Sequence, residues 1–202
     1  MPESASLDLT QFVRNVPDFP KPGIVFKDIT PLLLHPPAFE AAIDRLADEY
    51  RDQDIDVIAT AEARGFLFAA PLAMKLGKGL VPIRKPGKLP YQTHSHSYDL
   101  EYGSDTLEMH VDGIEAGQKV LVVDDLLATG GTIGACCEMI EKCDAKVTAC
   151  AFLINLTFLP GAEKLSRYPI SASSSIRNIV MPDKKTVRTT LKKLDSGDER
   201  YL

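Results

Sequence analysis

The sequence has few cysteines, and those present do not form a recognisable site. Only four of its 202 residues are cysteine, at positions 136, 137, 143 and 150, with no C-x-x-C spacing and no histidine nearby. This pattern matches neither a zinc site nor a disulfide framework, so we expect buried or half-buried thiols in a reducing compartment. A chain of this length buries about 70% of its unfolded surface and needs neither disulfides nor metals to fold.

Long apolar runs and an excess of positive charge are also missing. The best apolar candidate, residues 147–159, is shorter than the roughly 18 residues that span a bilayer, and it contains Asn155. The N-terminal Met-Pro-Glu-Ser lacks the basic start and apolar stretch of a signal peptide. With 23 Lys and Arg against 28 Asp and Glu, the net charge is −5, which argues against a broad nucleic-acid-binding face. The sequence therefore predicts a cytoplasmic protein with no membrane and no nucleic-acid partner.

The sequence does contain apolar runs that alternate with amphipathic stretches. This alternation is typical of βαβ units and predicts an α/β fold with a mostly parallel, twisted central sheet flanked by helices. We expect strands at 56–60, 80–83, 119–123 and 147–154, and helices after Pro36-Pro37, at 65–76 and at about 132–143. Leu107, Met109 and Val111 alternate with polar residues, which predicts a half-exposed strand at 106–111, antiparallel and at an edge.

Two stretches do not fit the alternation. Residues 85–103 are rich in Pro, Gly, His, Ser and Tyr, and a loop of this length inside a domain predicts a lid or binding loop. The tail at 171–202 is a basic C-terminal extension, not a separate domain, in which a short amphipathic helix fits the spacing of Val187, Leu191 and Leu194. The main domain is therefore predicted to span residues 1–170.

The strongest chemical signal is the block VLVVDDLLATGGT at residues 120–132. An apolar strand is predicted to end at two acids, Asp124 and Asp125, and a Gly-containing loop then opens a helix. Ligands of open α/β sheets bind at the carboxyl ends of the strands. Backbone N–H groups of this loop can hold a phosphate at the helix N-terminus, and the two carboxylates suit a sugar's hydroxyls or a cation. The predicted phosphate loop consists of Ala128, Thr129, Gly130, Gly131 and Thr132.

Other phosphate-binding motifs lack a necessary residue here. A Walker A loop ends in Gly-Lys-Ser/Thr, and this loop has no lysine. A dinucleotide fingerprint requires G-x-G-x-x-G, and this loop has only Gly130-Gly131. An ordinary strand-to-helix turn explains the glycines but not the adjacent acids.

The block resembles the phosphoribosyl-pyrophosphate (PRPP) signature of the type I phosphoribosyltransferase family. Four further segments resemble the adenine phosphoribosyltransferases within that family, in order along the chain: PDFPKPGIVFKDITP at 17–31, EARGFLF at 62–68, IRKPGKLP at 83–90 and YDLEYG at 98–103. The likeness runs from about residue 8 to residue 170. It implies the type I phosphoribosyltransferase fold, with a small N-terminal hood in residues 1–35 and a lid loop at 85–103.

The resemblance implies transfer of the 5-phosphoribosyl group of PRPP to N9 of adenine, giving AMP and pyrophosphate in purine salvage. Mg²⁺ would be held mainly by PRPP and not directly by the protein. Asp124 and Asp125 would orient the ribose hydroxyls, and residues 128–132 the 5′-phosphate. Purine N9 would attack C1′ with inversion, and positioning and charge stabilisation would supply most of the catalysis.

The resemblance also assigns roles outside the PRPP block. Arg64 belongs to the loop Glu62 to Gly65, which would hold pyrophosphate and which in the family often contains a strained or cis peptide. Arg84 and Lys88 would also reach pyrophosphate, and in the family a basic residue of their loop can enter the neighbouring subunit's site, which implies a homodimer. Lys85 would reach pyrophosphate in the same way, and for this residue a solvated surface charge is an equal alternative. The lid would contribute Glu101, near the purine as a general base, and Tyr102, whereas His94 and His96 are expected on the lid surface. Adenine would lie in the hood, held by Val25, Phe26 and the backbone of Lys27, where the family often has arginine.

Three alternatives stay open at this point. A sister enzyme that acts on hypoxanthine, guanine or xanthine would share the PRPP block and differ in the hood. A non-catalytic regulator would bind PRPP or nucleotides without turnover. A Rossmann-like methyltransferase would also show acids and glycines near a strand end, but it leaves the segments around Arg64 and Arg84 unexplained.

Overall fold

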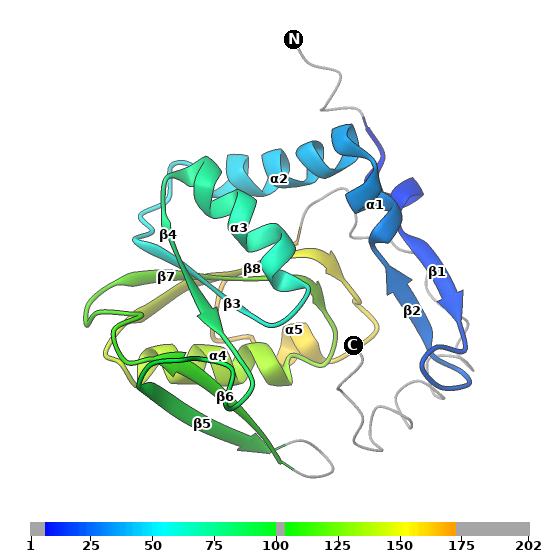
Figure 1. The fold of residues 1–202 in the computed structure, drawn as a ribbon. Helices are drawn as coiled ribbons and strands as arrows, with labels where there is room; N and C mark the ends of the chain where they lie inside the picture. Colours follow the sequence, from blue (N-terminus) through cyan, green and yellow to red (C-terminus); the bar gives the residue numbers. More distant parts are fainter. Residues whose placement is uncertain (1–6, 100–103, 173–202) are drawn as a thin grey trace.

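The computed structural model describes residues 7–99 and 104–172, and a parallel five-stranded sheet lies at its centre (Figure 1). The strand order is β4-β3-β7-β8-β9, and every neighbouring pair is parallel. The strands are β3 (Val57–Ala61), β4 (Gly79–Ile83), β7 (Lys119–Leu127), β8 (Lys146–Asn155) and β9 (Ile170–Ala172). This arrangement confirms the predicted α/β fold class.

Helices cover both faces of the sheet (Figure 1). On one face lie α2 (Pro36–Tyr50) and α3 (Gly65–Leu76), and on the other lie α4 (Gly131–Glu141) and the short α5 (Gly161–Lys164). Successive side chains of β7 pack against the two layers in turn. Val120 and Val122 belong to the hydrophobic core on the α4 side of the sheet, whereas Leu121 and Val123 belong to the core on the side of α2 and α3. A strand buried on both faces gives a continuous apolar run, which is why the sequence predicted this strand.

The predicted lid contains regular structure. Residues 93–99 form β5 (Thr93–Asp99), which pairs antiparallel with β6 (Ser104–His110) in a separate two-stranded ribbon. The expectation of an irregular loop throughout 85–103 was therefore wrong for this part. The half-exposed antiparallel strand was confirmed, with Leu107 and Met109 buried, but Val111 follows the strand and is exposed. The ribbon meets the sheet at an isolated bridge between Arg84 and Glu108.

The N-terminal segment stands apart from the five-stranded sheet (Figure 1). After the short 3-10 helix η2 (Leu9–Phe12), strands β1 (Arg14–Pro17) and β2 (Val25–Asp28) form an antiparallel hairpin, and α1 (Thr30–Leu34) follows. The peptide bond between Phe19 and Pro20 in the hairpin turn is cis.

The sheet continues past residue 170, the predicted end of the domain. Strand β9 pairs with β8 at Ile170, Ser171 and Ala172, and the Ser171 hydroxyl is hydrogen-bonded to the Tyr50 hydroxyl in α2. The rest of the basic extension, with its predicted helix, lies outside the described residues. Among the described helices, none has both the length and the apolar character needed to cross a membrane. The thiols are buried at positions 136, 137 and 150 and partly exposed at Cys143, as expected.

Candidate functional site

The carboxyl ends of β3, β4 and β7 lie side by side. Arg64 comes shortly after β3, Arg84 directly after β4, and the site residues of the PRPP block lie in and just after the end of β7. One detail differs from the sequence prediction. Strand β7 does not end at the two acids but runs through Asp124 and Asp125 to Leu127. The side chains of the two acids lie close enough for each to affect the pKa of the other.

Asp125 is paired with Arg64. The Arg64 Nη2 atom lies 2.6 Å from Asp125 Oδ2, and the Asp125 side chain is only 4% exposed. Burial raises the pKa of Asp125, and the Arg64 guanidinium acts in the opposite direction. Arg64 lies between β3 and α3, after a cis peptide bond between Glu62 and Ala63, as the resemblance implied for this loop. The structure thus joins two predicted site residues that are 61 positions apart.

Asp124 lies against the first turn of α3. A Cβ atom built on Gly65 would come 2.8 Å from Asp124 Oδ1 and 2.4 Å from Thr60 Oγ1, so only glycine fits without a shift. Burial, and next the neighbouring Asp125 carboxylate, raise the pKa of Asp124 well above its ordinary value. The backbone N–H of Asp125 donates to Asp124 Oδ1 at 2.8 Å, which fixes the carboxylate in place. A polar partner from a ligand would relieve the cost of keeping this group charged.

The loop after β7 surrounds a small cavity of about 70 Å³. Its lining consists of Asp124 and residues 126–133, which include the whole predicted phosphate loop. Gly130 has φ of +79° and Gly131 begins α4, so the chain makes a left-handed turn directly into a helix N-terminus. Drug-sized ligands need pockets of about 300 Å³ or more, so this cavity fits one small group such as a phosphate.

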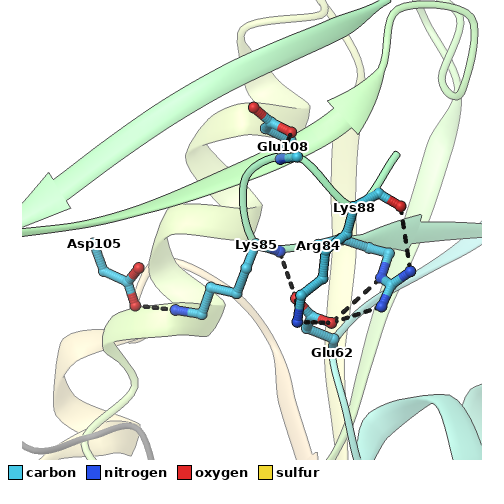
Figure 2. Close-up of polar contacts among 7 residues, drawn as sticks. Glu62, Arg84, Lys85, Lys88, Asp105 and Glu108 are labelled. Carbon is cyan, nitrogen blue, oxygen red and sulfur yellow. Dashed lines mark hydrogen bonds and ion pairs between the residues drawn. The ribbon is translucent and has the colours of Figure 1, made fainter. Parts of the chain in front are cut away.

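A third group of charges gathers around Glu62 (Figure 2). Arg84 and Lys88, both predicted site residues, form ion pairs with its carboxylate at 2.9 Å and 3.1 Å. The backbone N–H of Lys85 donates to Glu62 Oε1 at 2.6 Å, while the Lys85 ammonium pairs with Asp105 in β6. The Lys85 side chain is therefore an ion-paired and partly exposed charge.

The N-terminal hairpin contacts Arg64. The Arg64 guanidinium carbon lies 5.0 Å from the centre of the Phe26 ring, and Arg64 Nη1 donates to the Lys27 carbonyl at 3.4 Å. Lys27 is buried, its ammonium donates to Asn15 Oδ1 at 2.6 Å, and burial lowers its pKa. Val25 and Phe26 are partly buried. The predicted hood is thus connected directly to the loop that holds Arg64.

The histidine pair was expected on the lid surface, and for His96 this was wrong. His96 is 9% exposed, lies 3.0 Å from Glu138 through Nε2, and accepts from Lys142 at 2.7 Å through Nδ1. It therefore joins β5 to α4, whereas His94 is exposed on the same strand. The lid residues Glu101 and Tyr102 lie outside the described residues.

Sequence reasoning named Glu62 only as the start of the loop 62–65 that the resemblance assigns to pyrophosphate. It did not single out Thr60, which lies beside Gly65, Asn15, which accepts from Lys27, or Asp105, which pairs with Lys85. Glu62 and Thr60 had one usable signal, their position at the end of a buried strand next to Arg64. Among residues 7–99 and 104–172, no group of three His, Cys, Asp or Glu side chains is arranged to hold a metal ion. Asp124 and Asp125 are the carboxylates beside the phosphate loop, and carboxylate and phosphate oxygens are the ligands that Mg²⁺ prefers.

Comparison with known proteins assigns this architecture to a family. A family model described as the phosphoribosyl transferase domain matches residues 32–183. An adenine phosphoribosyltransferase of Rhodopirellula baltica is 60% identical over 164 residues, which is 81% of this chain and 80% of that protein.

Solved structures give the same result. The crystal structure of the adenine phosphoribosyltransferase from Thermoanaerobacter pseudethanolicus has a TM-score of 0.79 at 52% identity, covering 81% of this chain and 95% of that one. The enzyme of Saccharomyces cerevisiae, crystallised with an imino-altritol bisphosphate and adenine, has a TM-score of 0.76 at 39% identity, with coverage of 81% and 95%.

Proposed function

This chain belongs to the adenine phosphoribosyltransferase family, and from that premise we propose that it transfers the 5-phosphoribosyl group of PRPP to N9 of adenine. The products are AMP and pyrophosphate, and the reaction serves purine salvage. The observation that carries the proposal is the joining of the Asp124-Asp125 pair, the phosphate loop and Arg64 at one end of the sheet. A sugar phosphate needs these three kinds of group together.

The PRPP block holds the ribose 5-phosphate part in this proposal. The cavity lined by residues 126–133 takes the 5′-phosphate at the N-terminus of α4, where backbone N–H groups and the helix dipole favour an anion. Asp124 and Asp125 accept hydrogen bonds from the ribose hydroxyls. Because Asp125 is held by Arg64 and Asp124 by a backbone N–H, both acceptors are in position before substrate arrives.

Pyrophosphate leaves towards the cationic side of the site. Arg64, Arg84 and Lys88 supply this charge, and an arginine fork suits a group with several oxygens. The carboxylates and the substrate's phosphate oxygens form a donor set that fits Mg²⁺, which PRPP itself mainly holds. When bound, Mg²⁺ supplies neutralisation of the charge that develops on the leaving pyrophosphate.

Adenine binds in the hood, between the Phe26 ring and the apolar Val25, with its edge read by the backbone around Lys27. The Lys27 ammonium already donates to Asn15, so its side chain positions the hairpin and does not stack on the base. Glu101 and Tyr102 close the lid over the reacting ribose, and Glu101 accepts the proton of the purine ring. A closed lid keeps water away from an oxocarbenium-like C1′.

The active form is a cytoplasmic homodimer in this proposal. Leu67 and Met74, seven residues apart on α3, are 44% and 85% exposed, and Leu80 in the edge strand β4 is 37% exposed. Burial of these side chains against a second copy would remove apolar surface from water. The first turn of α3 lies beside Arg84, whose guanidinium carbon is 5.9 Å from the centre of the Phe66 ring, so a second copy seated there would lie next to the pyrophosphate side of the site.

The test is steady-state formation of nucleotide from PRPP and Mg²⁺, with adenine, hypoxanthine, guanine and xanthine compared in parallel. We expect turnover of adenine with at least a hundredfold preference in kcat/KM, because a site that hydrogen-bonds one set of ring atoms rejects bases with another. Preferred turnover of a different base would leave the PRPP site intact and refute the role of the hood. PRPP binding without any turnover would identify a regulator and refute the enzyme.

A further inference from the structure

The Glu62 carboxylate holds together the cationic loop that follows β4 (Figure 2). Arg84 donates to Glu62 Oε2 from Nε at 3.3 Å and from Nη2 at 2.9 Å, and the Lys88 ammonium lies 3.1 Å from the carboxylate. The Glu62 side chain is 8% exposed, whereas those of Arg84 and Lys88 are 32% and 49% exposed. One buried anion therefore faces two partly exposed cations.

Glu62 is fixed independently of those cations. Its backbone N–H donates to the Ile83 carbonyl at 3.0 Å, and its Oε1 accepts the Lys85 backbone N–H at 2.6 Å. These bonds attach both ends of the residue to the end of β4. Although burial acts to raise it, the pKa of Glu62 lies below its ordinary value because the Lys85 N–H, Arg84 and Lys88 donate to the ionised form. Glu62 is thus ionised at neutral pH and held in place by backbone hydrogen bonds.

Neutralisation allows the two cations to lie close together. Arg84 and Lys88 share one carboxylate, so the repulsion between them is offset and the group keeps a net charge of +1. The Nε and Nη2 atoms of the Arg84 guanidinium both donate to Glu62, and Nη1 donates to the Lys88 carbonyl at a longer 3.4 Å. This geometry orients the guanidinium and the ammonium towards the same side of the loop.

We propose that Glu62 is a positioning residue for the phosphoribosyl transfer, one that presents Arg84 and Lys88 to the leaving pyrophosphate. The inference rests on the proposed function, because it assigns a purpose to cations already placed in that reaction. Glu62 does not contact the reacting atoms. It acts as a fixed anchor and not as a stand-in anion that pyrophosphate displaces, since its bond to the Lys85 N–H does not depend on Arg84 or Lys88.

Glu62→Gln tests the proposal, because the amide oxygen still accepts the Lys85 N–H while the charge is lost. We expect kcat/KM for PRPP to fall about 10- to 100-fold, the effect of a misplaced substrate-binding group, with KM for adenine changed less than about twofold. The Kd for Mg²⁺-pyrophosphate, measured by calorimetry on the full-length protein, should rise about tenfold. The matched control is Glu108→Gln in β6, which loses the same charge beside the same loop but keeps its contact with the Gly87 N–H.

A double-mutant cycle separates positioning from general destabilisation. In an Arg84→Ala/Lys88→Ala background, Glu62→Gln should weaken pyrophosphate binding less than about threefold further, because the groups it positions are gone. Additive losses would overturn the inference, as would tighter binding of pyrophosphate by Glu62→Gln, which a displaceable stand-in anion predicts. If Glu62→Gln does not fold, Glu62→Asp retains the charge but not the reach, and wild-type pyrophosphate affinity in that variant would overturn the proposal. Absence of AMP formation by the wild type would refute the proposed function alone, since the binding measurements stand without turnover.

Discussion

Arg64 Nη2 lies 2.6 Å from Asp125 Oδ2, and this ion pair joins the loop after β3 to strand β7. The guanidinium also faces the Phe26 ring of the hairpin at 5.0 Å. Three separate parts of the chain therefore meet at one side chain. Because Asp125 is almost fully buried, the pair affects both the stability of the fold and the arrangement of the site.

Replacement of Arg64 by alanine leaves a buried carboxylate without its cation. We expect the free energy of unfolding at pH 8 to fall by about 3 kcal/mol, the lower end of the cost of breaking a buried ion pair. Without Arg64 the pKa of Asp125 rises further, so in the variant this carboxyl becomes protonated as the pH falls towards 5. The difference in the free energy of unfolding between variant and wild type should therefore be smaller at pH 5 than at pH 8. Urea titrations at both pH values measure this, and Arg64→Ala/Asp125→Asn should recover part of the loss. The same loss at both pH values, with no recovery, would contradict the prediction.

The buried charge of Asp124 lowers the stability of the fold but serves substrate binding, so Asp124→Asn should raise the stability of the protein and lower its turnover. A raised pKa in the folded state means that the protonated form stabilises folding below the unfolded pKa of about 3.9, and that this stabilisation is lost as the pH rises through the folded pKa. At pH 8 we therefore expect Tm to increase by about 2–4 °C, or about 1 kcal/mol, with a smaller gain near pH 4. Turnover should fall about 10- to 100-fold, as when a charged hydrogen-bond acceptor is lost. A lower Tm at pH 8 would show that the charge is well solvated.

Gly65 has no room for a side chain. In Gly65→Ala the new Cβ would lie 2.4 Å from Thr60 Oγ1 and 2.8 Å from Asp124 Oδ1, so α3 or the carboxylate must shift. We expect a loss of about 1–3 kcal/mol in the free energy of unfolding, together with a higher KM for PRPP. Gly79→Ala is the matched control, because its Cβ would meet only Val57 Cγ2 at an ordinary 3.5 Å.

The Thr60 hydroxyl offers a way to check the cause. It is buried and makes no hydrogen bond within residues 7–99 and 104–172, so its removal breaks no such bond there. Thr60→Ala in the Gly65→Ala background should therefore recover part of the lost stability. If the double variant is less stable than Gly65→Ala alone, the collision with Thr60 is not the source of the loss.

The exposed side chains of α3 predict the location of a homodimer interface. Leu67→Glu/Met74→Glu places two charges on the proposed face, and burial of unpaired charge is costly. Light scattering after gel filtration should show a mass near 22.1 kDa for this variant and twice that value for the wild type. Leu34→Glu is the control, since Leu34 is 77% exposed but belongs to α1 in the N-terminal segment. Dissociation by Leu34→Glu alone would place the interface at the hood.

The end of the sheet predicts where the chain can be shortened. Truncation after residue 172 keeps β9, and we expect the free energy of unfolding to stay within about 1 kcal/mol of that of the full chain. Truncation after residue 169 removes β9 and leaves the buried Tyr50 hydroxyl without Ser171, a loss of about 1–3 kcal/mol. Urea titrations of the two variants compare them directly, and equal stability would mean that β9 contributes little.

Local pattern in the sequence determined much of this protein. Buried strands and amphipathic helices have different apolar periods, so the fold class and most elements of the central sheet followed from the chain alone. Gly130-Gly131 between a strand and a helix indicated an anion site, because glycine and a helix N-terminus act locally. The resemblance of five ordered segments added the family, which the comparisons confirmed.

Only the tertiary structure decided which charges meet. Nothing local shows that Arg64 pairs with Asp125 rather than with solvent, that Glu62 collects Arg84 and Lys88, or that His96 turns inward against α4. The extension of β7 through its two acids and the addition of β9 were missed for the same reason, since both depend on pairing with β8. Strand pairing and ion pairing join residues that are far apart in the chain, and their energies depend on burial and distance, which exist only once the chain has folded.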